Sequence, residues 1–224
     1  MKKVALLIIT VLALTSCRLD LKSWEPILIE ASDNIVTKEY KLTPFEEIKM
    51  RCVGNVELIQ SETKNGIVEL TAPDNYIEFY NFASDGKQLD ISFTKEAINI
   101  HVKDVKIRVY TTDLIKLENS GAASINMDSL DTDKLEIKNS GVGSITISGV
   151  ADYVELTNSG VGSIDTGGLK APNVKANVSG VGSIECFASE SLEGKVTGIG
   201  SLNYGGNPKH KDIKRTGVGS ITEM

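Results

Sequence analysis

A Gly-x-Gly pattern that could cradle a phosphate recurs along the second half of the chain. A dinucleotide-binding loop needs a third glycine three residues after the second, so that the backbone can approach a pyrophosphate closely. In the five copies that carry both glycines, this third position holds Thr146, Asp165, Glu185, Asn203 or Thr222. The pattern therefore predicts no dinucleotide site and no other cofactor site.

The sequence lacks the residue spacings that nucleophilic catalysis and metal binding require. A nucleophile elbow needs a serine with glycine two residues before and two residues after it, and no serine of the chain has both. The two histidines, His101 and His210, lie in different sections without Cys or His neighbours at metal-ligand spacing. The sequence therefore predicts no catalytic nucleophile and no metal site.

Paired carboxylates are the last candidate for catalysis. Asp165 and Glu185 hold equivalent places in neighbouring copies of the pattern, so a stack of copies would bring them together. Two carboxylates are the usual machinery of glycoside hydrolysis. No basic residue accompanies them in that column. We expect no enzymatic activity and keep a polysaccharide-active enzyme as an alternative.

The segment around the glycines is a repeat, and the repeat determines the architecture. Ser140-Gly141-Val142-Gly143-Ser144-Ile145 is one of six similar segments, whose second residues stand at 121, 141, 160, 180, 198 and 217, in steps of 20, 19, 20, 18 and 19. Apolar and polar residues alternate on both sides of the glycines, which predicts two short strands per unit. A unit of about 19 residues buries its apolar face only by stacking on its neighbours.

The repeat therefore predicts an all-β fold, a parallel β-helix with coils about 4.8 Å apart. A β-propeller or barrel is the alternative, but a propeller blade needs about 40 residues. The inward column would consist of Ile125, Ile145, Ile164, Ile184, Leu202 and Ile221.

Polar residues also fall into columns in this register. Asn119, Asn139 and Asn158 precede successive corners, where stacked amides can hydrogen-bond to one another. Val178 and Val196 replace asparagine in later coils. Opposite charges alternate on the outward face, which favours neighbouring strands; the expected neighbours are Glu118 with Lys138, and Lys175 with both Glu155 and Glu193. We interpret these columns as folding ladders rather than ligand-binding stripes.

Residues 1–17 have the features of a targeting segment. Lys2 and Lys3 precede an apolar run that is too short to span a bilayer. Leu14-Thr15-Ser16-Cys17 resembles the lipobox of bacterial lipoproteins. The resemblance implies cleavage before Cys17 and a diacylglycerol on its thiol, which would anchor the chain to a membrane. Arg18 follows the cysteine, and in this scheme its presence implies the outer membrane; an ordinary signal peptide is the alternative.

The rest of the chain divides into a polar tether at 18–38, a β-rich section at 39–114 and the repeat array at 115–224. Residues 48–58 align with 137–147 without a gap, which predicts a degenerate first coil. Further strands are expected at 67–71, 76–82, 88–93 and 97–110, with Asn65-Gly66 and Asp85-Gly86 as hairpin turns. This aromatic-rich section is expected to cap the stack, with its rings in the core; a carbohydrate or partner site is the alternative.

The net charge and the positions of the cysteines exclude some classes of function. The formal net charge of −6 argues against nucleic-acid binding. Cys52 and Cys186 fall in distant coils, beyond disulfide distance, and are expected to be buried thiols. A charged cluster at 209–215 precedes the last coil, where charges discourage end-to-end aggregation; an acidic partner is the alternative.

The array, the lipobox and the degenerate coil together resemble the head GIN-domain family, Bacteroidetes-type lipoproteins labelled as auto-transporter adhesins. The resemblance covers residues 40–224 and rests on Phe45 and Ile48, on Gly54-Asn55-Val56 and on the repeated Ser-Gly-x-Gly-Ser-Ile. It implies a β-helical fold and an envelope location. The family has no functional residues that could be assigned to positions of this chain. Asp128-Ser129-Leu130 also resembles the O-glycosylation acceptor triplet of Bacteroidetes envelope proteins, which makes Ser129 a candidate modification site.

The sequence thus predicts a lipid-anchored, non-enzymatic binding or adhesion module at the outer membrane, on its periplasmic or surface face. Its ligand would be a glycan or a protein. Besides the enzyme, a structural envelope scaffold whose partners bind the last coil is an alternative. The oligomeric state is not predicted.

Overall fold

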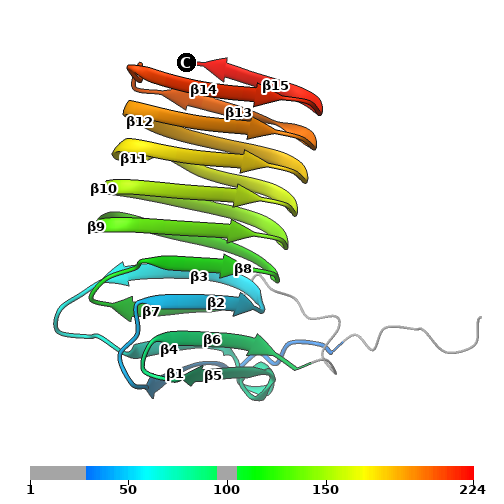
Figure 1. Cartoon of the computed structure of the whole chain (residues 1–224). Coiled ribbons are helices and arrows are strands. Elements are labelled where there is room, and N and C mark those ends of the chain that lie inside the picture. Colours follow the sequence, from blue (N-terminus) through cyan, green and yellow to red (C-terminus); the bar gives the residue numbers. More distant parts are fainter. Residues whose placement is uncertain (1–28, 95–104) are drawn as a thin grey trace, which may run out of the picture.

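The chain winds into a β-solenoid. The computed structural model describes residues 29–94 and 105–224, and Figure 1 shows their strands stacked one above another along a common axis. In this part of the chain, 15 strands form one continuous hydrogen-bonded sheet. The prediction of an all-β parallel β-helix is confirmed. The elements are β1 (Ile35–Lys41), β2 (Glu47–Arg51), β3 (Val53–Gln60), β4 (Ile67–Pro73), η1 (Asp74–Phe79), β5 (Tyr80–Ser84), β6 (Gln88–Phe93), β7 (Lys106–Thr111), β8 (Lys116–Asn119), β9 (Ala122–Asn139), β10 (Val142–Asn158), β11 (Val161–Val178), β12 (Val181–Val196), β13 (Ile199–Gly205), β14 (His210–Arg215) and β15 (Val218–Glu223).

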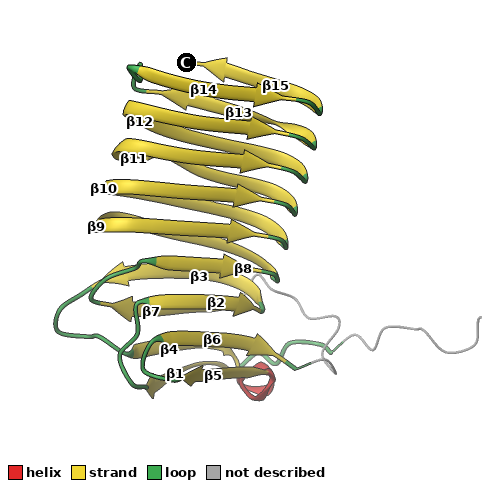
Figure 2. Ribbon diagram, viewed as in Figure 1, coloured by secondary structure: helices red, strands yellow, loops and turns green. Residues whose placement is uncertain are grey.

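Each coil runs along the back of the stack, bends at one edge and returns along the front (Figure 2). β9 to β12 are 16 to 18 residues long because ladder hydrogen bonding continues through this bend, with a register shift at each. Ile145 pairs with Ile125 on one side and with Ile164 on the other. The repeats therefore stack in the predicted register.

The second edge is built from the glycines of the repeat. Gly162 has a φ of +146°, and a Cβ added to it would lie 1.9 Å from the carbonyl oxygen of Gly143 in the coil before it. Gly160 meets the carbonyl oxygen of Gly141 at 2.2 Å in the same way. Only glycine allows such close backbone approach. The repeated glycines thus let successive corners stack without a gap.

The predicted degenerate first coil is confirmed. β3 pairs with β9 so that Val53 lies beside Ala122 and Val56 beside Ile125. On the front, β2 pairs with β8, which places Met50 beside Asn119. These are the positions that the gapless alignment assigns to the two segments.

Antiparallel strands end the stack at its N-terminal side. β4 pairs with β1 and β7, and β5 forms a hairpin with β6 around Asp85-Gly86, as predicted. The hairpin predicted at Asn65-Gly66 is wrong. β3 and β4 flank β7, which is parallel to β3 and antiparallel to β4, so the two segments joined by this turn do not pair. Of the strand expected at 97–110, residues 97–104 lie outside the described residues.

The strand predicted over residues 76–82 is also wrong in its first half. Residues 74–79 form the 3₁₀-helix η1, and β5 begins only at Tyr80. Pro73 ends β4, and Tyr76 and Phe79 are spaced three residues apart, as one turn of a 3₁₀-helix requires. Tyr76 is buried while Phe79 packs against the core from its rim. The aromatic residues lie in or against the core, as expected, but Tyr76 and Phe79 reach it from a 3₁₀-helix rather than from a strand.

The apolar interior follows the predicted column. Ile125, Ile145, Ile164, Ile184 and Leu202 are buried, whereas Ile221 is partly exposed because β15 pairs with β13 alone among the described strands. Each fully buried side chain contributes about 1.5–3 kcal/mol to stability.

The asparagine ladder is formed inside the solenoid. Nδ2 of Asn119 donates to Oδ1 of Asn139 at 2.9 Å, and Nδ2 of Asn139 donates to Oδ1 of Asn158 at 3.2 Å. Nδ2 of Asn158 ends the ladder on the carbonyl oxygens of Gly162 and Ser183. All three asparagines are buried. The ladder therefore satisfies polar groups that would otherwise be orphaned in the core.

Cys52 and Cys186 are free and buried, as predicted. Burial raises the pKa of each thiol from 9.0 to about 12. The unfolded chain therefore loses thiol protons first, so we expect the free energy of unfolding to fall as pH rises from about 9 towards 12. At pH 8 a Cys17→Ser variant should resist maleimide until it is denatured, which intact-mass measurement would show. Fast labelling of the native chain would contradict these buried positions.

Candidate functional site

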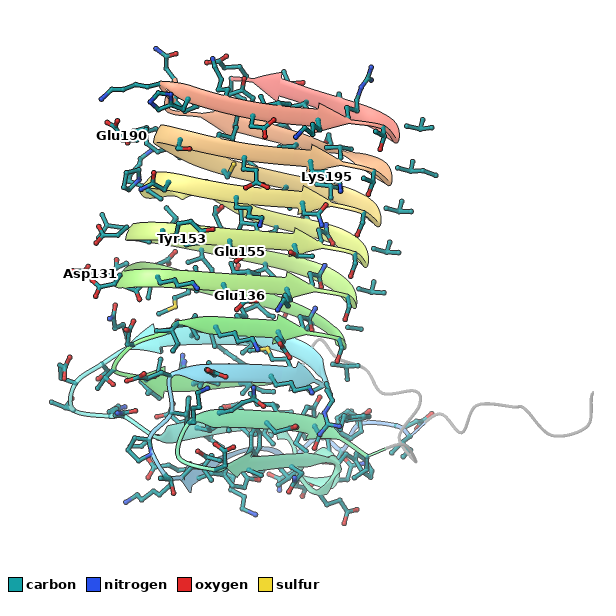
Figure 3. The ribbon with its side chains drawn as sticks, in the orientation of Figure 1. Asp131, Glu136, Tyr153, Glu155, Glu190 and Lys195 are labelled. Atoms are coloured by element: carbon teal, nitrogen blue, oxygen red, sulfur yellow. The ribbon has the colours of Figure 1, made fainter. Side chains whose placement is uncertain are left out.

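The front of the solenoid is a charged face whose ions pair with one another. Figure 3 shows Glu136, Glu155 and Lys195 on these front strands. Lys175 lies between Glu155 and Glu193, with N···O distances of 3.8 and 3.9 Å. Pairs this exposed contribute little stability each. The predicted neighbours of Lys175 are confirmed and fit a folding ladder. Like charges also meet in this column, where Glu136 lies beside Glu155 and Glu193 beside Asp212.

One predicted pair differs in detail. Glu118 lies beside Lys138 in the register, as expected. However, Glu118 forms its ion pair with Lys116 at 2.8 Å, and Lys138 pairs with Glu136. The pairs form along one strand because residues two apart in a strand point to the same side.

The back of the solenoid is the serine face. One column contains a serine from each repeat, namely Ser124, Ser144, Ser163, Ser183, Ser201 and Ser220. Asp165 and Glu185 are neighbours in the next column, as predicted, and Oδ1 of Asp165 accepts a hydrogen bond from the backbone N–H of Gly167. Neither carboxylate lines the cleft described next, so the two acids lie on the open strand surface.

A cleft of about 730 Å³ opens on the same side as the serine face, where β3, β7 and β9 meet. β3 and β9 pair only as far as Leu58 and Met127. Beyond that point β9 turns through its edge with no matching turn of β3 beneath it, which leaves the hollow. The residues lining the cleft are Asn55, Val56, Glu57, Leu58, Ile59, Gln60, Lys106, Asn126, Asp128 and Ser129.

Charges in the cleft are held by an ion-pair cluster. Oε2 of Glu57 lies 2.7 Å from Nζ of Lys106 and 3.1 Å from Nε of Arg108. Hydrogen bonds from Lys106 and Arg108 lower the pKa of Glu57, so this carboxylate is ionised at neutral pH. The cleft therefore offers a fixed carboxylate beside the ammonium group of Lys106.

Gln60 fixes the bend that forms the rim of the cleft. Its Nε2 donates to the carbonyl oxygens of Thr112 and Asp131, each at 2.9 Å, and its Oε1 accepts from the N–H of Asp131 at 2.9 Å. Ser129, within this bend, has a φ of +63°, which non-glycine residues seldom adopt. The side chain of Gln60 thus acts as a substitute for the missing turn of β3.

Polar side chains of β9 complete the rim. Asn126, Asp128 and Ser129 are all exposed. Oδ1 of Asp128 accepts a hydrogen bond from Oγ of Ser148 in the next coil at 3.3 Å. Together with Asn55 and Lys106, these groups can donate and accept hydrogen bonds from several directions.

The structure places the residues singled out from sequence in different locations. Ser129 is at the rim of the cleft, and His210 is exposed on β14. Cys17 and His101 lie outside the described residues. No group of three or more His, Cys, Asp or Glu suited to a metal ion occurs within residues 29–94 and 105–224. Sequence reasoning missed the other cleft residues because they come from the one place where the repeat is interrupted.

Comparison with known proteins identifies the family. Residues 44–208 match the family model "Putative auto-transporter adhesin, head GIN domain". A crystal structure described as a putative adhesin from Bacteroides fragilis NCTC 9343 is similar, with 30% identity, a TM-score of 0.75 and coverage of 88% of this chain and 100% of that one.

Two further crystal structures described as putative adhesins share the fold. The protein from Parabacteroides merdae ATCC 43184 has 20% identity, a TM-score of 0.56 and coverage of 88% and 98%. The protein from Parabacteroides distasonis ATCC 8503 has 21% identity, a TM-score of 0.57 and coverage of 88% and 99%. No curated protein matches the chain.

The described residues contain no helix long and apolar enough to cross a membrane. The resemblance inferred from Phe45, Gly54-Asn55-Val56 and the Ser-Gly-x-Gly-Ser-Ile repeats is confirmed by the family match. That match covers most of the chain, and the relatives are described as adhesins rather than enzymes. The chain belongs to the head GIN-domain family of auto-transporter adhesin-like proteins.

Proposed function

We propose that this protein is a non-enzymatic adhesion module of the bacterial cell envelope that binds a glycan in the cleft between β3, β7 and β9. The observation that carries the proposal is the lining of the cleft by amide, carboxylate, hydroxyl and ammonium groups. Its volume of about 730 Å³ suits a segment of a few sugar rings.

The chemistry of the cleft favours a ligand rich in hydroxyl groups. A sugar hydroxyl both donates and accepts a hydrogen bond, so it is matched by amides such as Asn55 and Asn126 and by the carboxylate of Asp128. Ile59 adds an apolar contact for a sugar ring. The bend is held by Gln60, so the rim is set before the ligand arrives, which lowers the entropic cost of binding.

A glycan array probed with the purified chain tests this proposal. We expect binding to a defined glycan, and we expect Asn126→Ala to weaken it by about tenfold, since a hydrogen bond in a binding site contributes about 1–1.5 kcal/mol. Asn203→Ala is the matched control, because Asn203 stands in the same column of the serine face but outside the cleft. Equal loss in both variants, or binding to no glycan, would overturn the proposal.

The proposal includes attachment to the outer membrane through a diacylglycerol on Cys17 and modification of the exposed Ser129. The lipobox-like Leu14-Thr15-Ser16-Cys17 supports the first, and the position of Ser129 on an accessible bend supports the second. Protein extracted from its membrane should show both added masses in intact-mass spectra. Cys17→Ala should remove the lipid and Ser129→Ala the sugar; a spectrum of the bare chain would contradict both.

A further inference from the structure

The glycine edge of the solenoid presents an apolar ridge to solvent. The residue between the two glycines of each repeat points outward, and these residues are Val142, Val161, Val181, Ile199 and Val218. They are between 51% and 76% exposed and make up five of the eight exposed large apolar residues of the described chain. In Figure 3 this edge lies opposite the one that carries Asp131 and Glu190. We call this column the aliphatic ridge.

Stacking of the ridge residues on one another within one molecule buries only part of their apolar surface. Each valine covers the next one along the axis, and Val218, at the end of the column, is the most exposed at 76%. β-Branched side chains suit such columns. Nevertheless, more than half of the surface of each ridge residue stays in water, and a contiguous apolar strip on a protein surface usually marks an interaction site.

A shallow hollow runs beside the ridge on the serine-face side. It is lined by the glycine and serine that follow each ridge residue, for example Gly162 and Ser163 after Val161. None of the residues that line it is charged. The missing Cβ atoms of the glycines give the hollow its depth. The edge therefore combines a row of apolar knobs with a parallel row of uncharged holes.

We propose that the aliphatic ridge is an interface at which two copies of this chain associate side by side. Knobs and holes recur once per coil, about 4.8 Å apart. A partner stays in register along all five positions only if it has the same spacing, and a second copy has that spacing at its own ridge. The two faces beside the ridge differ in charge, and this difference selects the symmetry of the pair.

The charges favour a parallel pair. A two-fold axis along the solenoid sets the serine face of each copy beside the charged face of the other, whereas a perpendicular axis sets like faces beside each other. In the parallel pair, the serine face of one copy lies next to the charged face of its partner. The serine face contributes the column with Glu57, Asp165 and Glu185, and the charged face contributes a second column. That second column holds Lys49, Lys138, Lys195 and Lys214 beside one glutamate. Charges of opposite sign thus flank the interface and favour this orientation.

The interface is small. Stable complexes bury about 800 Å² on each partner, and five ridge residues supply roughly half of that at most. We therefore expect weak association in solution that becomes substantial when copies are held at high local concentration. A covalent trap is the appropriate measurement, because it accumulates short-lived pairs.

Disulfide trapping in a Cys17→Ser background tests the proposal, since the two other cysteines are buried. Val161→Cys should cross-link at least about tenfold faster than Val150→Cys, whose valine is similarly exposed at 49% but lies on the opposite edge. In a mixture of Val142→Cys and Val218→Cys chains, the parallel pair predicts like-with-like dimers. Equal rates for Val161→Cys and Val150→Cys, or an excess of mixed dimers, would overturn it.

Sedimentation velocity of chains without introduced cysteines gives a second readout. The triple variant Val142→Thr, Val161→Thr and Val181→Thr keeps β-branched side chains and so preserves the strands. It should sediment as a monomer at concentrations where the parent chain shows a concentration-dependent shift. The same concentration-dependent shift in both proteins would contradict the role of the ridge.

Discussion

Replacing Gly162 by alanine is expected to destabilise the solenoid by about 3 kcal/mol or more. The added Cβ would lie 1.9 Å from the carbonyl oxygen of Gly143, and the φ of +146° is itself unfavourable for alanine. Relief would require the two corners to separate, yet ladder hydrogen bonds hold them on both sides. Urea denaturation followed by circular dichroism would measure the loss.

Gly205→Ala is the matched control for this prediction. A Cβ on Gly205 would meet only Cδ2 of Phe187, at an ordinary contact distance of 3.8 Å, and its φ is not in the left-handed region. We expect its free energy of unfolding to change by less than about 1 kcal/mol. If Gly162→Ala were equally mild, the close stacking of corners would be wrong.

Replacing Asn139 by alanine is expected to cost about 3 kcal/mol. Asn139 is the middle member of the ladder, so its loss removes the acceptor of Asn119 and the donor to Asn158 in a dry core. Each orphaned buried group costs about 1–3 kcal/mol. Thermal and urea unfolding of the purified variant would give the value.

Asn177→Ala supplies the control for the ladder. Asn177 is only half-buried on the charged face, and its Oδ1 has no hydrogen-bond partner. Its replacement should change stability by less than about 0.5 kcal/mol. The Asn119→Ala, Asn139→Ala double variant should cost less than the sum of the single variants by about 1 kcal/mol, because the two share one hydrogen bond. Strict additivity would mean that the ladder contributes no coupling.

The solenoid could be predicted from sequence because its information is repeated. Six copies of one segment determine the register, and the register then determines which residues become neighbours, as for Asn119 with Asn139 or Glu155 with Lys175. Each prediction of this kind depends only on counting residues between glycines. Even the degenerate coil at Val53-Gly54 could be predicted from sequence, because it keeps the alternation of apolar and polar residues and one corner glycine.

The errors lie where the repeat is absent. Asn65-Gly66 has the residues of a hairpin turn, but β7, from 40 positions later in the chain, inserts between the strands it joins. Local turn chemistry carries no information about such an insertion. Tyr76 and Phe79 stand three residues apart, which fits one turn of a 3₁₀-helix better than the two-residue alternation of a strand.

The candidate site could not be predicted for the same reason. The cleft exists because β3 leaves the coil after Gln60 while β9 continues through its bend, so its walls come from residues about 70 positions apart. Asn126 and Asp128 look like ordinary outward residues of one repeat in the sequence. Ser129 is the one cleft residue that the sequence indicates as a candidate site, and it does so through a resemblance unrelated to the cleft.

The most direct test of the adhesion proposal is an NMR titration of the isotope-labelled chain with the glycan that binds best on the array. The proposal predicts that amide shifts change at Asn126, Asp128, Ser129 and Lys106 and stay constant along the charged face, for example at Glu155 and Lys175. Shifts that concentrate on the charged face or on the aliphatic ridge, with the cleft unchanged, would contradict the assignment of the cleft as the binding site.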